Sequence, residues 1–172
     1  HADTYTDGVI VVKHEELPVK RNGSRIQFNH PCELTGNVIA NALSYIYFDE
    51  KGLLKKKGTL RVFQDDEIRK LVPLIIQAFS VATPAQVVAV SSYSERMLLT
   101  DQQNYCIMFI SDRSLNIAFS RIHMLQTYND TMSEKKKYTK TKENPTRISH
   151  SRFWKLIPSA GQRLEPTHEN WL

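Results

Sequence analysis

The sequence predicts an α+β fold, in which an antiparallel meander of strands packs against one main helix and one short helix. Apolar residues recur at helical spacing over about 65–81 and, more weakly, over about 34–43. The second half of the chain instead contains β-rich runs separated by polar segments, and the SDRS that joins the last two is typical of a hairpin turn. These runs lie at 86–90, 105–110 and 115–122.

A length of 172 residues predicts a single domain spanning 1–172. Nearer the N-terminus, a β-branched run at 9–12, the turn signal Asn22-Gly23 and a run at 25–28 predict a loose hairpin. After the short helix, two further strands are predicted at 45–49 and 59–63.

The main helix has an apolar face and an acidic start. Asp65, Asp66 and Glu67 are expected to provide its N-cap and to place negative charge where the helix dipole is positive. Pro73 lies inside it and predicts a kink or a break near Arg69, at a cost of about 3 kcal/mol. Burying the large apolar side chains gains more than this, so the two halves are expected to stay in line.

Composition excludes few functions. The net charge of +5 would suit an anionic partner, but such a charge is also common in globular proteins. The hydrophobic content of 41% is ordinary for a globular protein. No apolar run approaches the roughly 20 residues that cross a bilayer. Cys32 and Cys106 could form one disulfide in an oxidising compartment, or remain free with Cys106 in the core.

No motif predicts an enzyme. His30 and Cys32 lack partners at the spacing of a zinc site, and His14 lacks a second histidine one turn later. The hydroxyls of 91–95 have no nucleophile elbow around them, and the glycines form no phosphate-binding loop. We therefore expect no catalytic residue, metal, cofactor or small-molecule substrate.

A lysine-rich segment at 128–151 is predicted to be a loop. It could bind phosphates, which gives a nucleic-acid-binding or phosphate-binding domain as the alternative function, or it could contact an anionic protein or lipid surface. We expect a solvated loop rather than nucleic-acid binding, because base readout needs an ordered platform. The cations concerned are Lys135, Lys136, Lys137, Lys140, Lys142 and Arg147.

The order of several short motifs resembles that of small proteobacterial envelope lipoproteins. The matching positions are the main helix with its internal proline, the Thr83-Pro84 step, the strand at 87–90, the SRFWKLIP that begins at Ser151, and the final Trp171-Leu172. The similarity spans about 43–172. A mature lipoprotein begins with an acylated cysteine, whereas this chain begins with His1.

The resemblance implies a non-enzymatic structural or interaction protein of the periplasm or of the periplasmic face of the outer membrane. Other envelope proteins would be its partners, as in the outer-membrane core complex of a type IVB secretion system, and a lipid anchor upstream of His1 could attach it to the membrane. A cytoplasmic location stays open. Trp154 and Trp171 could anchor a partner or could pack in the core.

Overall fold

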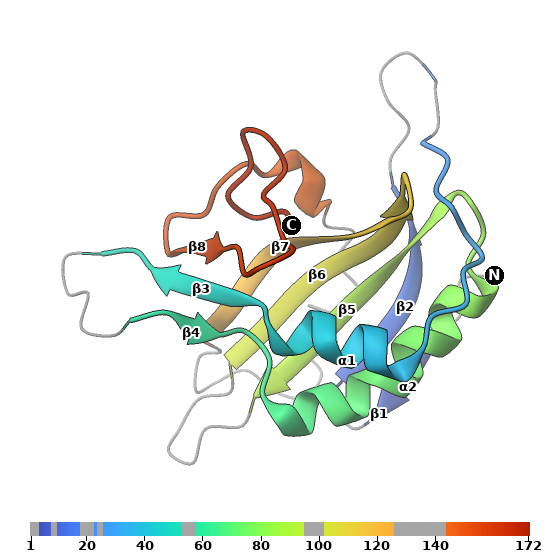
Figure 1. The fold of residues 1–172 in the computed structure, drawn as a ribbon, viewed down its shortest axis with the longest axis horizontal. Helices are drawn as coiled ribbons and strands as arrows, with labels where there is room; N and C mark the ends of the chain where they lie inside the picture. Colours follow the sequence, from blue (N-terminus) through green and yellow to red (C-terminus); the bar gives the residue numbers. More distant parts are fainter. Residues whose placement is uncertain are drawn as a thin grey trace.

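The computed structural model describes residues 4–7, 10–17, 23, 26–52, 58–94, 102–125 and 144–172. Over these residues the chain forms two α-helices and two antiparallel sheets, which confirms the predicted α+β class (Figure 1). The elements are β1 (Thr4–Asp7), β2 (Ile10–Glu16), α1 (Gly36–Ser44), β3 (Tyr47–Glu50), β4 (Leu60–Arg61), α2 (Asp65–Val81), β5 (Gln86–Ser94), β6 (Gln102–Ser111), β7 (Ser114–Leu125), the short 3-10 helix η1 (Pro145–Arg147) and β8 (Trp154–Ile157).

The larger sheet has the strand order β1-β2-β5-β6-β7, so the meander predicted for the second half is its β5-β6-β7 part. A two-residue turn joins β6 to β7. Asp112 and Arg113 in this turn have φ values of 51° and 63°. Two successive positive φ values are typical of the type I′ turn, whose twist matches that of the strands it connects.

Both faces of the larger sheet are covered, because successive side chains of a strand point to opposite faces. On one face, side chains of β5, β6 and β7 pack with those of α1 and α2 in the larger core cluster. On the other face they form a smaller cluster with Phe28, against which Trp171 packs. The smaller cluster comprises Phe28, Val87, Ala89, Tyr105, Ile107, Phe109 and Ala118.

α2 has the predicted bounds, but its N-cap differs from the expectation, and of the kink or break predicted at Pro73 the break does not occur. Its N-cap is Gln64, whose backbone N–H donates to the Glu67 carboxylate at 3.1 Å, rather than one of the aspartates. Pro73 does not break the helix, which is continuous from Asp65 to Val81. Pro73 is exposed, whereas Leu71 and Ile75 are buried, so the apolar face holds the helix together across it.

Replacing Pro73 with alanine is expected to raise the free energy of unfolding by about 1–3 kcal/mol, because alanine restores a backbone donor at an exposed position inside the helix. Urea denaturation followed by circular dichroism measures this change. The exposed Gln77→Ala, one turn later, is the control and should change stability by only a few tenths of a kcal/mol. A destabilised Pro73→Ala variant would contradict this explanation.

The smaller sheet has the order β4-β3-β8, and the C-terminal segment connects it to the larger one (Figure 1). Leu156 of β8 donates its N–H to the Glu169 carbonyl at 3.0 Å. The next residues pair with β7, where the Phe119 N–H donates to the Asn170 carbonyl at 2.8 Å and Ile117 exchanges two hydrogen bonds with Leu172. Residues 169–172, called the tail below, therefore join the edges of both sheets.

The predicted N-terminal hairpin is wrong. β2 pairs with β1 and β5, and residues 26–30 form no strand. Their backbone instead bonds distant segments, since Phe28 donates to the Pro84 carbonyl at 2.8 Å and Asn29 to the Ile110 carbonyl at 2.9 Å. β2 is paired on both sides, and so it cannot also accept the 25–28 run.

Two other boundaries also differ from prediction. The strand expected at 59–63 is reduced to Leu60–Arg61, because Val62 and Phe63 turn into the core before α2. The strand expected at 86–90 is longer, because β5 continues through the polar residues that follow it to Ser94. Ser91 and Ser92 are buried there because Gln103 and Asn104 of β6 donate to their hydroxyls at 3.2 and 3.3 Å.

Candidate functional site

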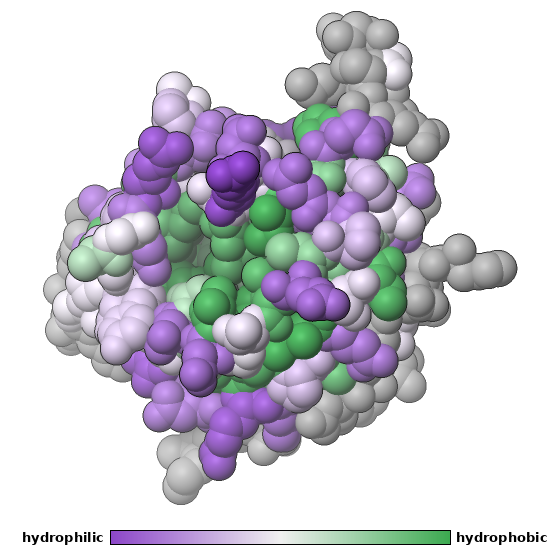
Figure 2. Space-filling model, turned by 45° about the vertical axis from the view of Figure 1, so that its right-hand side comes forward, coloured by the Kyte–Doolittle hydropathy of each residue, from purple (hydrophilic) through white to green (hydrophobic). Residues whose placement is uncertain are grey.

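An open hollow of about 860 Å³ lies between α1, the start of β7 and the segment from Ser159 to Glu165. Figure 2 shows a face of the molecule that is hollowed and apolar inside a polar rim. The apolar side chains that line the hollow are Ala42, Tyr45, Ile46, Leu115, Ile117, Ala160 and Leu172. The polar side chains are Asn41, Ser114, Asn116, Ser159, Gln162, Arg163 and Glu165.

α1 forms one wall because it is apolar on more than one side. Ile39 and Leu43 point into the core, as their exposed fractions of 0% and 1% show. Val38 and Tyr45 are instead 51% and 55% exposed. Tyr45, the C-cap residue of α1, lines the hollow together with Asn41 and Ala42 of the helix.

The opposite wall is fastened to the end of α1. The Tyr45 carbonyl accepts hydrogen bonds from Ser159 Oγ at 2.8 Å and from Gln162 Nε2 at 3.0 Å. Gln162 Oε1 also accepts the Ser159 N–H at 2.9 Å. A carbonyl that the helix leaves unpaired is thus satisfied by the turn across the hollow, and this contact fixes the width of the site.

A second hollow of about 420 Å³ adjoins the first and shares Ser114, Asn116, Arg163 and Glu165 with it. Trp171 lies in its wall, where it makes an edge contact with Phe109 at 5.7 Å between ring centroids. Trp171 Nε1 donates to Asn116 Oδ1 at 3.1 Å. The tryptophan therefore fixes the tail on the face opposite the helices.

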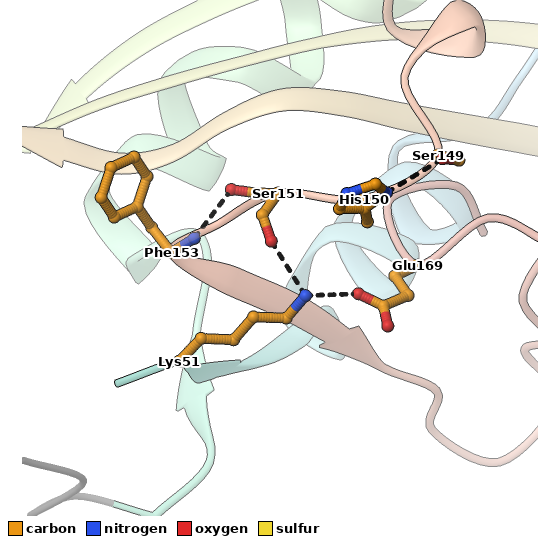
Figure 3. Close-up of polar contacts among 6 residues, drawn as sticks. All are labelled: Lys51, Ser149, His150, Ser151, Phe153 and Glu169. Atoms are coloured by element: carbon orange, nitrogen blue, oxygen red, sulfur yellow. Dashed lines mark hydrogen bonds and ion pairs between the residues drawn. The ribbon is translucent and has the colours of Figure 1, made fainter. Parts of the chain in front are cut away.

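A separate polar cluster lies where β3 ends and β8 begins, and Figure 3 shows how its side chains converge. Lys51 Nζ donates to the Glu169 carboxylate at 2.6 Å and to the Ser151 carbonyl at 2.8 Å. The hydrogen bond from Lys51 lowers the pKa of Glu169. Phe153 beside it is 66% exposed. These contacts hold the tail against the smaller sheet. The cluster therefore has a structural role.

The histidines named in the sequence are structural. His30 is buried, and its Nε2 accepts the Ile110 N–H at 3.0 Å, so Nδ1 carries the proton and donates to the Gln86 carbonyl at 2.8 Å. Burial lowers the pKa of this ring. His14 bonds the Ala78 carbonyl at 2.7 Å. Among the described residues, no group of three or more His, Cys, Asp and Glu side chains could hold a metal ion.

The cysteines are free thiols in the structure, so the disulfide is not formed. Cys106 lies on β6 and is fully buried, which raises the pKa of its thiol. Cys32 is partly buried in the loop before α1, and its N–H donates to the Phe79 carbonyl at 3.0 Å. The arrangement agrees with the alternative of two free cysteines, one of them in the core.

Of the predicted interaction residues, the structure describes Arg147, Trp154 and Trp171, and it places the two tryptophans in different clusters. Trp154 is 5% exposed and packs in the larger core, whereas Trp171 is partly exposed and lines the second hollow. Arg147 is exposed on η1. The predicted loop is described only from residue 144, so the remaining cations of that prediction lie outside the described residues. These are Lys135, Lys136, Lys137, Lys140 and Lys142.

Comparisons with protein-family models, with curated proteins and with solved structures find no match for this chain. In the described part of the chain, no helix has the length and apolar character needed to cross a membrane. The hollow and the tail beside it are therefore interpreted from their own geometry.

Proposed function

We propose that this protein is a non-enzymatic interaction module of the bacterial cell envelope and that the 860 Å³ hollow receives a segment of a partner protein. The observation that carries the proposal is an apolar floor, open to solvent, between walls held by hydrogen bonds. Partner anchors bind best where a preformed apolar pocket is surrounded by a polar rim. Tyr45, 55% exposed at the wall, is an aromatic contact of the kind enriched in interfaces.

The envelope assignment rests on the sequence resemblance alone. It places the protein in the periplasm or on the periplasmic face of the outer membrane, as an accessory of a multiprotein assembly such as a type IVB secretion core complex. Fractionation of the full-length gene product tests this part. Recovery with the envelope and with other envelope proteins would support it, and recovery only as a cytoplasmic monomer would contradict it.

The hollow is tested by blocking it. Ala160 is exposed and lines the hollow, so Ala160→Trp places a large side chain at its mouth. Val81 is also exposed, at the end of α2, and lines neither hollow, which makes Val81→Trp a matched control. After gentle solubilisation, we expect the partners that co-purify with the wild type to remain with Val81→Trp and to be lost from Ala160→Trp. Equal recovery with both variants would contradict the proposal.

A further inference from the structure

Building on the proposed function, we propose that the partner segment binds in extended form, as a strand added antiparallel to β7 at Leu115. The hollow would then recognise its partner through the main-chain atoms of Leu115 as well as through its apolar lining. Three features support this proposal: the direction of the β7 peptide groups, the hydrogen bonds that the tail makes to the same edge of β7, and the charges of the rim.

The Leu115 peptide groups point away from β6. The β6-β7 turn has two residues, so Ser111 and Ser114 form its closing hydrogen-bonded pair. Hydrogen-bonded and non-hydrogen-bonded pairs then alternate along the ladder, and Leu115, opposite Ile110, falls on a non-hydrogen-bonded pair. Its N–H and C=O therefore face the outer edge of the sheet, as do those of Ile117 and Phe119.

The tail shows that this outer edge of β7 pairs with an extended segment through main-chain hydrogen bonds. Ile117 donates to the Leu172 carbonyl at 3.0 Å and accepts from the Leu172 N–H at 2.9 Å. The tail runs antiparallel to β7, so pairing would next reach Leu115. No residue in the described ranges pairs with Leu115 on that side. The hollow begins there, with Leu115 and Leu172 both in its lining.

The side chains of such a strand would alternate between the two faces. A residue directly opposite Leu115 would point its side chain to the same face as Leu115, toward α1 and into the apolar hollow. The residue that makes the main-chain hydrogen bonds is therefore also the one whose apolar side chain is buried. This combination of strand addition with a side-chain pocket is a recurring mode of peptide recognition.

The rim favours an uncharged segment over a polyanion. Arg163 and Glu165 are the charged residues of the first hollow, and the second hollow adds Asp112. One cation and two anions give no net attraction for phosphates. Binding is therefore expected to change little with salt, unlike that of a nucleic acid.

The test uses an acetylated and amidated peptide of alternating threonine and valine, titrated at millimolar concentration into the isotope-labelled protein. We expect chemical shift changes centred on Leu115, Ala42 and Tyr45. A peptide N-methylated on its valines loses the donors that face β7 and should bind at least about tenfold more weakly. A peptide N-methylated on its threonines is the matched control and should bind as the parent does.

A protein variant tests the same contact from the other side. Leu115→Pro removes the edge-facing N–H and leaves the hydrogen bonds to β6, a position where edge strands tolerate proline. We expect this variant to lose the peptide and Leu115→Val to retain it, with the fold of each checked by its amide spectrum.

The outcomes separate the two proposals. Equal binding of both N-methylated peptides, shifts centred elsewhere or no shifts would overturn strand addition. If Ala160→Trp still loses the natural partners in that case, the hollow remains a docking site that works without strand pairing. If Ala160→Trp also keeps its partners, the proposed function fails as well.

Discussion

Asn170→Asp is expected to lower the free energy of unfolding by about 3–5 kcal/mol, although the two side chains have nearly the same shape. Asn170 is 0% exposed, and its Nδ2 donates to the Phe119 carbonyl at 2.8 Å and to the Pro145 carbonyl at 2.9 Å. In the aspartate variant, a carboxylate oxygen replaces Nδ2 and faces the Phe119 and Pro145 carbonyls. Both hydrogen bonds are therefore lost, and a negative charge is buried without a partner. The tail should detach from β7.

Urea denaturation followed by tryptophan fluorescence measures this effect, because Trp171 lies in the tail and is expected to report its release. Asn41→Asp makes the same chemical change at an exposed position of α1 and should alter stability by less than about 0.5 kcal/mol. If Asn170→Asp proved as stable as Asn41→Asp, the tail would not hold the two sheets together in the way described.

Glu67→Gln is expected to stabilise the protein at alkaline pH. Glu67 is 3% exposed, its Oε1 has no hydrogen-bond partner among the described atoms, and burial raises the pKa of its carboxyl from 4.5 to about 7. The folded state therefore binds more protons than the unfolded state between these two values, and stability falls as the pH rises from 4.5 through 7. Above pH 7 the full penalty, about 3 kcal/mol, is present.

Glutamine removes this penalty and can still accept the Gln64 N–H, as glutamine does in capping boxes. Denaturation at pH 9 should show Glu67→Gln more stable than the wild type by up to about 3 kcal/mol, and the difference should shrink toward zero near pH 4.5. The exposed Glu50→Gln is the control, with a change within about 0.5 kcal/mol at both pH values. A gain of the same size at both pH values would show that ionisation is not its cause.

Short-range sequence patterns predicted the helix and the hairpin, whose residues lie close together in the chain. The periodicity over about 65–81 predicted α2, and the SDRS turn predicted the β6-β7 hairpin. The pairing of distant segments could not be predicted in this way. β8 pairs with β3 across about a hundred residues, and the extended 26–30 segment satisfies its backbone on Pro84 and Ile110 instead of on a neighbouring strand.

The hollow was not predicted, because its lining comes from three parts of the chain that share no motif. α1, the start of β7 and the C-terminal segment each contribute a few ordinary residues. One signal in the sequence pointed toward this hollow, and another toward the second hollow beside it. Tyr45 begins an aromatic run directly after the predicted helix, and Trp171 lies at the chain end, but neither signal indicates which surface the side chain reaches.

Site-specific photocrosslinking in the producing cells tests most directly whether the hollow is the partner site. Tyr45 and Val81 are 55% and 53% exposed, and Tyr45 lines the hollow whereas Val81 does not. With p-benzoyl-phenylalanine introduced at one position or the other, we predict a discrete adduct with an envelope protein from position 45, absent when Ala160→Trp is added, and none from position 81. Adducts of equal yield from both positions, or none from position 45, would contradict the account.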